Sequence, residues 1–397
     1  MTIPSLESFG FDADYQAVYD LAYRYARDEL YELCERMDNE DWFPEEAFRG
    51  LAEHGLLGVT VPTEFGGGGM DVLAQCFIAE AVAYWNHAIA AGMLASDNLC
   101  LHNLVRNASE GQKREYLPRF CDGSLIGALG MTEPGAGSDA LGSMATTARR
   151  DGDDYVLNGR KLFITNGPVA DVLLVYAKTA PEKRQKGISA FIVEKGFAGF
   201  AVAQKLDKMG WRGSPTGELV FDDCRVPAGN LVGAENAGHI VMMSGLDIER
   251  VIGAFFDIGI AQRAFDLALE YATQRKQFGR AIGEFQMVQA MLADMYTEIE
   301  SMRALTYQVG REIVDLPEGE GGRGVVHKRS AAALLAAGRG AMRVLDQAVQ
   351  IHGGMGFMRE TEVNRLYRSG KVGEIAAGSN QIRQVIIAGE LLREAGG

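Results

Sequence analysis

The stretch MTEPGAGSD at residues 131–139 directly follows the apolar segment 125–130, which has the composition of a short strand. It combines hydroxyl side chains with closely spaced turn formers. Because glycine has no Cβ to block close approach, such a loop can present backbone N–H groups to an anionic or carbonyl-rich ligand. A second strand-like stretch, KLFITNG at residues 161–167, ends in an aromatic residue, a hydroxyl and a turn. Together the two stretches predict a site for a planar ligand with polar edges.

Composition narrows the class of protein. The chain has 397 residues, of which 47% are hydrophobic and 23% are charged, and this is enough for two or three domains of an ordinary soluble protein. Its formal net charge of -14 repels phosphate backbones and anionic lipids. We therefore expect neither nucleic-acid binding nor membrane binding as the main activity.

The cysteines and the N-terminus indicate the compartment. The five cysteines are scattered and lack any CxxC spacing, so we expect no disulfide framework and no metal site. The chain begins with a polar, acidic stretch that resembles neither an export signal nor an organelle leader. Its apolar runs are shorter than the roughly 20 residues that span a bilayer. A soluble protein in a reducing cytoplasm fits best.

The pattern of apolar and polar residues changes twice along the chain. Amphipathic helical patterns occupy residues 13–37, 44–57 and 72–105, and short β-rich runs with Gly, Asn and Asp between them follow up to residue 232. Four long helical segments come last, at residues 239–275, 284–314, 325–352 and 362–395. We therefore predict an α+β multidomain protein with an N-terminal helical domain (1–124), a middle β domain (125–235) and a C-terminal helical bundle (236–397).

Five stretches carry a resemblance to a known family. MTEPGAGSD and KLFITNG resemble the flavin-binding segments of the acyl-CoA dehydrogenase family, and the likeness continues in RKQFG (275–279), QIHGG (350–354) and AGSNQ (377–381). The five stand in the family's order over most of the chain. The resemblance implies a β-barrel-like middle domain, a C-terminal four-helix bundle, FAD as cofactor and an acyl-CoA thioester as substrate.

In the middle domain, the resemblance assigns the backbone of the first stretch to the flavin ring. The hydroxyl of Thr132 then donates to the ring's carbonyl edge, and Ser138 reaches a phosphate. Phe163, where many relatives carry tryptophan, keeps an apolar wall beside the ring but lacks the indole donor. Judged alone, the loop reads as an ordinary turn and Phe163 as a core aromatic. The cofactor-binding residues implied here are Leu129, Met131, Thr132, Gly137, Ser138, Phe163, Ile164 and Thr165.

In the C-terminal part, the guanidinium of Arg275 suits a pyrophosphate because its planar fork matches phosphate oxygens. The alternative interpretation of Arg275 is a solvent-exposed surface charge that binds no ligand. In the family this contact reaches the FAD of a neighbouring subunit, which implies at least a dimer and favours a tetramer built as a dimer of dimers. The residues implied on this side are Arg275, Phe278, Gln286, Gln350, Ile351, Gly353, Gly354, Ser379, Asn380 and Gln381.

The catalytic base is predicted from a displaced carboxylate. Many relatives place glutamate just before the glycine of the C-terminal motif, where this chain has Ala377. The stretch SGLDIER at residues 244–250 resembles the isovaleryl-CoA dehydrogenase branch, in which the base matches Glu249. The alternative is that Glu249 pairs with Arg250 or with a nearby helix charge. In the family, the backbone N–H at Ala377 polarises the thioester carbonyl.

This resemblance implies desaturation of an acyl-CoA to a trans-2-enoyl-CoA. Glu249 takes the α-proton, and the β-hydride passes to flavin N5, from which an electron transfer flavoprotein collects the electrons. A glutamate has a reference pKa of about 4.3, so burial must raise its proton affinity. An acyl-CoA oxidase and a non-catalytic flavin-bound relative remain as alternatives.

The sequence also bears on the length and shape of the acyl chain. Gly253 lies one helical turn beyond Glu249 on the same face, so it either widens the acyl pocket or only permits helix packing. We favour a branched or medium acyl chain. Asp247 and Arg250 match positions near the CoA moiety, although a helix ion pair explains them equally well. The substrate-binding residues expected are Ser138, Leu246, Asp247, Arg250, Gly253 and Gly378.

Overall fold

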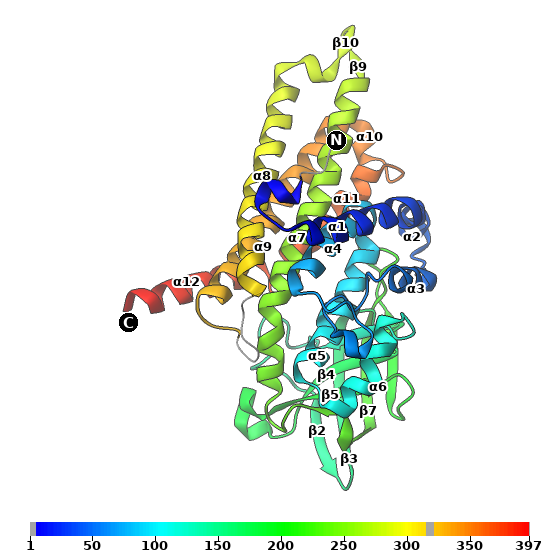
Figure 1. The fold of residues 1–397 in the computed structure, drawn as a ribbon, viewed down its shortest axis with the longest axis vertical. Coiled ribbons are helices and arrows are strands. Elements are labelled where there is room, and N and C mark those ends of the chain that lie inside the picture. The colour runs from blue at the N-terminus through cyan, green and yellow to red at the C-terminus, as the bar shows by residue number, and fades with distance from the viewer. Residues whose placement is uncertain (1–4, 315–320, 397) are drawn as a thin grey trace.

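The computed structural model describes residues 5–314 and 321–396 and has the three expected parts in chain order (Figure 1). The N-terminal helices are α1 (Ala13–Tyr25), α2 (Cys34–Glu40), α3 (Glu45–Glu53), α4 (Val72–Met93), α5 (Asn103–Asn107) and α6 (Glu110–Cys121). Helical backbone also joins α1 to α2 and α4 to α5, as the long patterns predicted.

Helix α4 is the centre of the N-terminal part. Its sequence is almost entirely apolar, and its first turn is capped by Asp71, whose Oδ1 accepts hydrogen bonds from the backbone N–H groups of Leu73 and Ala74. A helix that is apolar on all faces must be buried on all faces. Accordingly α4 packs against α1 on one side and α7 of the C-terminal part on another, so the two helical parts share one hydrophobic core.

The middle part is one eight-stranded sheet. Strands β6, β7, β3, β2, β4, β5 and β8 follow one another across it, and the short β1 pairs in parallel with β4. Apolar side chains pack on both faces of its centre. The strands are β1 (Gly127–Gly130), β2 (Thr147–Asp151), β3 (Asp154–Thr165), β4 (Val172–Lys178), β5 (Ile188–Glu194), β6 (Phe200–Lys205), β7 (Thr216–Pro227) and β8 (Leu231–Val232).

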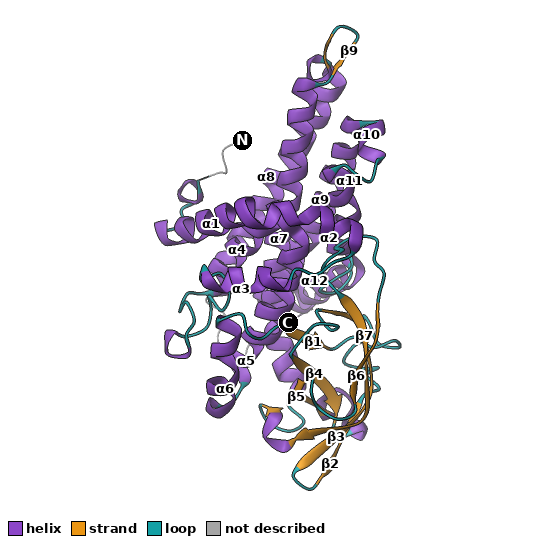
Figure 2. Ribbon diagram, turned by 90° about the vertical axis from the view of Figure 1, so that its right-hand side faces the viewer, coloured by secondary structure: helices purple, strands orange, loops and turns teal. Residues whose placement is uncertain are grey.

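The C-terminal part is built on three long helices that pack against one another (Figure 2). A small hairpin of β9 and β10 connects the first two of them. The elements are α7 (Gly238–Gln274), β9 (Lys276–Gln277), β10 (Arg280–Ala281), α8 (Gln286–Val314), α9 (Gly324–His352), α10 (Gly354–Phe357), α11 (Glu362–Gly370) and α12 (Asn380–Gly396).

The prediction of one continuous helix over residues 362–395 is wrong. The helix stops at Gly370, and a loop precedes α12. Ala377 and Gly378 both have left-handed backbone, with φ of 53° and 86°, which a right-handed helix cannot contain. The apolar spacing continues across this break, so the periodicity did not reveal it.

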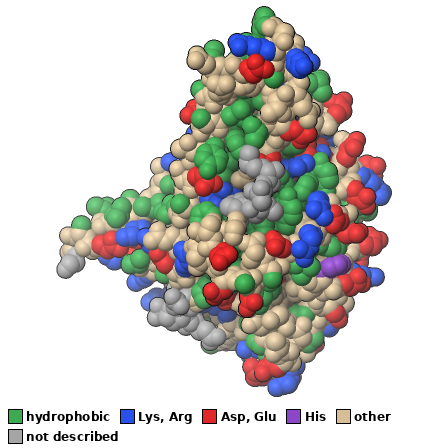
Figure 3. Space-filling view, turned by 45° about the horizontal axis from the view of Figure 1, so that its top comes forward, with side chains coloured by type: hydrophobic (Ala, Val, Ile, Leu, Met, Phe, Trp, Pro, Cys, Tyr) green, Lys and Arg blue, Asp and Glu red, His purple; other side chains and the backbone are tan. Residues whose placement is uncertain are grey.

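Helix α12 projects from the body of the molecule (Figure 1). Three of its apolar side chains are more than half exposed, namely Val385, Leu391 and Leu392. Hydrophobic side chains cover much of the projecting arm at the left of Figure 3, among charged groups of both signs. No described helix is both long enough and apolar enough to cross a membrane.

Candidate active site

The two motifs of the middle part are joined to each other. The backbone N–H of Leu162 donates to the carbonyl of Thr132 at 2.8 Å, and the Nζ of Lys161 donates to the carbonyl of Met131 at 3.3 Å. Lys161 also forms an ion pair with Glu133 at 2.8 Å, and both side chains are buried. The loop 131–138 and the end of β3 therefore form one unit.

Additional hydrogen bonds support the buried ion pair. Besides Lys161, the Glu133 carboxylate accepts the backbone N–H groups of Ala145 at 2.5 Å and Thr146 at 3.0 Å. Burial lowers the pKa of Lys161 to about 8, while the charge of Glu133 opposes that shift. A buried pair is tolerated only where such additional hydrogen bonds exist, because desolvating two charges is costly.

Phe163 stands out from the surface of this unit. Its side chain is 65% exposed, and its φ of 61° is a strained conformation for a bulky residue. The cause is an irregularity in the β3–β7 pairing between Lys161 and Ile164, which turns Phe163 outward and Ile164 into the core. An exposed aromatic ring held in a strained backbone is a typical ligand contact, and the core-aromatic alternative is wrong.

Polar groups beside Phe163 are free to bind a ligand. Within the described residues, the hydroxyls of Thr132, Ser138 and Thr165 make no hydrogen bond to protein. Gly135 and Gly137 have open space where a Cβ would stand, so a ligand can approach their backbone closely. An exposed ring, three free hydroxyls and an open loop fit a flavin, which has an apolar face and a polar edge.

Asn166 anchors this unit to the rest of the protein, a role that the sequence analysis missed. It has left-handed backbone with φ of 61°, and its buried Nδ2 donates to the carbonyls of Gly92 on α4 at 2.7 Å and Gly127 on β1 at 3.0 Å. Asn166 directly follows Thr165 in the KLFITNG stretch, and this position is the sequence feature that could have indicated its role.

One group of the remaining predicted cofactor residues lies at the far end of the same chain. Arg275 directly follows α7, and the hairpin after it lies at the top of Figure 1, whereas the sheet occupies the lower half. Phe278 at its tip is 93% exposed. The ring of Tyr271 stacks on that of His352 at 4.3 Å, which brings Gln350, Ile351, Gly353 and Gly354 to this end as well. Gln286, at the start of α8, is exposed beside them.

Glu249 has the surroundings of a base. It lies on α7 and is partly buried, and within the described residues its carboxylate has no hydrogen bond or ion pair. Burial raises its pKa to about 7, although the charges of Arg250 and Arg383 oppose the shift. The alternative that Glu249 pairs with Arg250 is wrong, because Arg250 binds Asp247 instead, at 2.7 Å.

Asp247 is completely buried at the centre of a polar network. Its carboxylate accepts from Arg250, from the backbone N–H of Gly322 at 2.8 Å and from the hydroxyl of Ser330 at 3.0 Å, and it meets His327 Nδ1 at 2.7 Å. This is the helix ion pair considered as the alternative. A direct contact of either side chain with CoA would require the surrounding groups to move.

The loop before α12 is held from inside by Arg383. This buried guanidinium donates to the carbonyls of Gly373 and Ala376 and to the side chain of Asn380. Asn380 is therefore buried and engaged, whereas Gln381 is exposed, and the hydroxyl of Ser379 accepts the backbone N–H of Ile382 at 3.5 Å. Within the described residues, the N–H of Ala377 has no hydrogen-bond partner.

Gly253 packs between helices. A Cβ added there would lie 3.3 Å from Leu334 of α9, so the space beside Gly253 is filled by that side chain. Leu246, three residues before Glu249, is partly buried against the core beneath the sheet. The structure thus supports the helix-packing alternative for Gly253.

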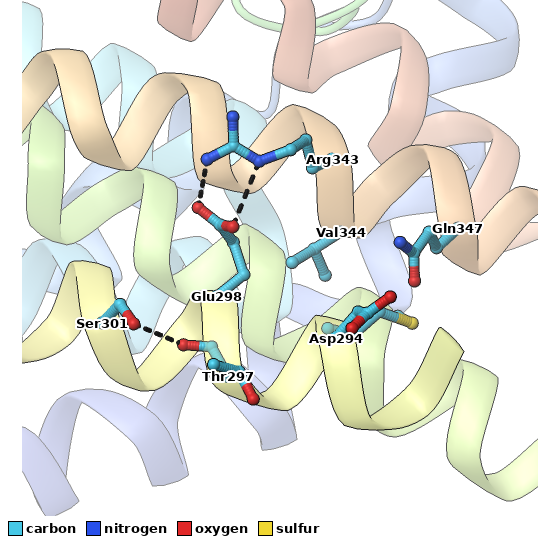
Figure 4. Close-up of a pocket in the computed structure, with 8 residues that line it drawn as sticks. Asp294, Thr297, Glu298, Ser301, Arg343, Val344 and Gln347 are labelled. Atoms are coloured by element: carbon cyan, nitrogen blue, oxygen red, sulfur yellow. Dashed lines mark hydrogen bonds and ion pairs between the residues drawn. The ribbon is translucent and has the colours of Figure 1, made fainter. Parts of the chain in front are cut away.

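Two cavities lie outside these residues. One of about 290 Å³ opens between α8 and α9 beside the Glu298–Arg343 ion pair (Figure 4). The other, of about 470 Å³, lies between Phe43 and the turn after Thr165. No group of three or more His, Cys, Asp or Glu side chains in the described part of the chain is arranged to hold a metal ion.

Comparison with known proteins agrees with this arrangement. Residues 12–124, 128–224 and 236–392 match the N-terminal, middle and C-terminal domains of acyl-CoA dehydrogenases. The chain is 43% identical to the mitochondrial isovaleryl-CoA dehydrogenase of Arabidopsis thaliana, over 94% of this chain and 89% of that protein.

Two solved structures show the same fold. Butyryl-CoA dehydrogenase from Megasphaera elsdenii has a TM-score of 0.91 and 36% identity, over 96% of this chain and 99% of that one. Glutaryl-CoA dehydrogenase in complex with glutaryl-CoA has a TM-score of 0.92 and 33% identity, over 96% of each chain. The chain belongs to the acyl-CoA dehydrogenase family.

Proposed function

We propose that this chain is an FAD-dependent acyl-CoA dehydrogenase in which Glu249 removes the α-proton of the thioester. The observation that carries the proposal is the unpaired, partly buried carboxylate of Glu249 with a pKa of about 7. A general base is most effective when its pKa lies near the working pH. A carboxylate neutralised by Arg250 would be too weak a base for this step.

The substrate carbonyl is polarised by the backbone N–H of Ala377. That N–H has no partner within the described chain, and the left-handed backbone at Ala377 and Gly378 sets its direction. A donor fixed before the reaction stabilises the negative charge that develops on the carbonyl oxygen as the α-proton leaves. Alanine at position 377 supplies this donor without placing a second carboxylate near Glu249.

FAD, when bound, would supply the acceptor for the β-hydride of the substrate. Thr132, Phe163 and Thr165 would hold its ring, and Ser138 would contact its phosphate side. Arg275 and the segment 350–354 bind the FAD of a second subunit, because on one chain they lie at the opposite end from the sheet (Figure 1). The proposed assembly is therefore at least a dimer and, by family likeness, a tetramer of two dimers.

The proposed substrate has a branched or medium acyl chain. The likeness to isovaleryl-CoA dehydrogenase supports branching, since that protein's name states its substrate. The proposed electron acceptor is an electron transfer flavoprotein, again from the family likeness. All five cysteines are unpaired in the structure, which is consistent with the proposed location in a reducing cytoplasm.

Anaerobic titration with a panel of straight, branched and aromatic acyl-CoA thioesters tests the proposal. We expect branched or medium chains to bleach the oxidised flavin fastest. Unchanged spectra with every thioester would reject catalysis and favour a non-catalytic flavin-bound relative. Rapid peroxide formation in air, without an added electron carrier, would instead identify an acyl-CoA oxidase.

A further inference from the structure

Arg383 on α12 links the loop before α12 to helix α7. It donates hydrogen bonds to the loop, and its charge acts on the carboxylates of Glu249 and Asp257 on α7. Its side chain has no exposed surface. Nη1 donates to the Gly373 carbonyl at 2.8 Å and to Asn380 Oδ1 at 2.9 Å, and Nη2 donates to the Ala376 carbonyl. Three acceptors within residues 373–380 are thus held by one planar group.

The bond to Ala376 bears directly on the N–H of Ala377. The carbonyl of Ala376 and the N–H of Ala377 belong to one planar trans peptide, so fixing the carbonyl fixes the direction of the N–H on the opposite side. A cationic donor on the carbonyl also polarises the peptide, which strengthens its N–H as a donor. The guanidinium therefore both aims and strengthens the proposed carbonyl-polarising group.

The charge of Arg383 also reaches Glu249 and lowers the pKa of that carboxyl against the effect of burial. Burial lowers the pKa of Arg383 itself to about 10, so it stays protonated at neutral pH. The other groups that face these two side chains are Arg250 and Asp257 on α7, Tyr176 on β4 and Glu374 in the loop. Asp257 has one carboxylate oxygen without a partner, and it lies against Gly373.

We propose that Arg383 is a positioning residue that orients and polarises the Ala377 N–H donor and keeps Glu249 available as the base. The inference rests on the proposed function, because it assigns Arg383 to the same reaction. It adds a residue that touches neither substrate nor flavin and acts through the peptide of Ala376 and through its charge.

Two substitutions separate the two effects. Arg383→Gln removes the charge, and Arg383→Lys keeps the charge but cannot donate to three acceptors in one plane. The rate of anaerobic flavin reduction by a good acyl-CoA substrate is measured across pH for each. Arg303→Lys is the control, because Arg303 is equally buried and hydrogen-bonded, to Glu300 at 2.7 Å and Gln262 at 2.9 Å, in another part of the core.

For Arg383→Gln we expect the limiting rate to fall on the order of a hundredfold, as for loss of one carbonyl-polarising donor. The pH at which the reduction rate rises on the acid side of its profile should also increase by about one unit, because the positive charge that lowers the pKa of Glu249 is gone. For Arg383→Lys we expect a similar loss of rate with no change in that pH. The control should lose stability but keep the wild-type pH profile.

A pH profile and limiting rate of Arg383→Gln that match the wild type would overturn the inference, and so would an upward shift in Arg303→Lys equal to that in Arg383→Gln. If Arg383→Gln does not fold, Arg383→Lys and Asn380→Ala carry the test, since both loosen the loop and keep a charge. Wild-type rates in both would overturn it. Failure of the proposed function is distinguishable, because the wild-type protein itself would then show no flavin reduction.

Discussion

Replacing Glu249 with glutamine should inactivate the protein and stabilise it at the same time. In the unfolded chain the carboxyl ionises with a pKa of about 4.5, whereas burial raises the pKa to about 7 in the folded protein. Below pH 4.5 the group is protonated in both states. Between pH 4.5 and 7 only the unfolded chain loses this proton, so the free energy of unfolding falls as pH rises, and the full penalty remains above pH 7.

The size of the effect follows from the same values. Each pKa unit is worth about 1.4 kcal/mol, so the ionised carboxylate costs the folded state up to about 3 kcal/mol at pH 8.5 and about 1 kcal/mol at pH 5.5. Because Glu249 is only partly buried, these are upper values. Glutamine has nearly the same shape and no charge to desolvate. The stability gained in Glu249→Gln should therefore grow by up to about 2 kcal/mol between the two pH values.

Urea unfolding of the flavin-loaded proteins at pH 5.5 and pH 8.5, at one protein concentration, measures this difference. Glu64→Gln is the matched control, since Glu64 is an exposed glutamate in a short turn with no hydrogen bond in the described residues, and we expect no change at either pH. A Glu249→Gln protein that is less stable than wild type at pH 8.5, or a gain that does not depend on pH, would refute the reasoning.

Three further substitutions test the cofactor site. Lys161→Met should lower the free energy of unfolding by about 3 to 5 kcal/mol, because Glu133 is left buried without its counter-charge; thermal unfolding measures this, and a loss under about 1 kcal/mol would contradict it. Phe163→Ala should weaken FAD binding in equilibrium dialysis while the flavin-free protein keeps its stability, since the ring is 65% exposed; a large loss of stability would show instead a structural role. Arg275→Ala should lower FAD retention and shift the oligomer to smaller species in analytical ultracentrifugation, whereas full FAD occupancy at low protein concentration would reject a contact between subunits.

Local patterns predicted much of the fold because they report burial. The apolar spacing identified α4 and the three long C-terminal helices, and the short β-rich runs identified the middle β domain. The break before α12 was missed because it depends on the backbone of Ala377 and Gly378 and on hydrogen bonds from Arg383, which leave the apolar spacing unchanged.

The candidate site was predicted in part. The motifs located Phe163 and Glu249, whose exposure and unpaired carboxylate the structure then showed. The buried side chains that hold the site's loops in place were identified only from the structure. The sequence assigned no role to Lys161 or Arg383, because their burial depends on acceptors that only the folded chain brings to them.

The most direct test of the account is the pH dependence of anaerobic flavin reduction by a good acyl-CoA substrate in the wild type and in Glu249→Gln. We predict a wild-type rate that rises through a single ionisation near pH 7, and no measurable reduction in Glu249→Gln with FAD fully bound. Reduction by Glu249→Gln at a rate close to wild type would show that another group removes the α-proton and would contradict the account.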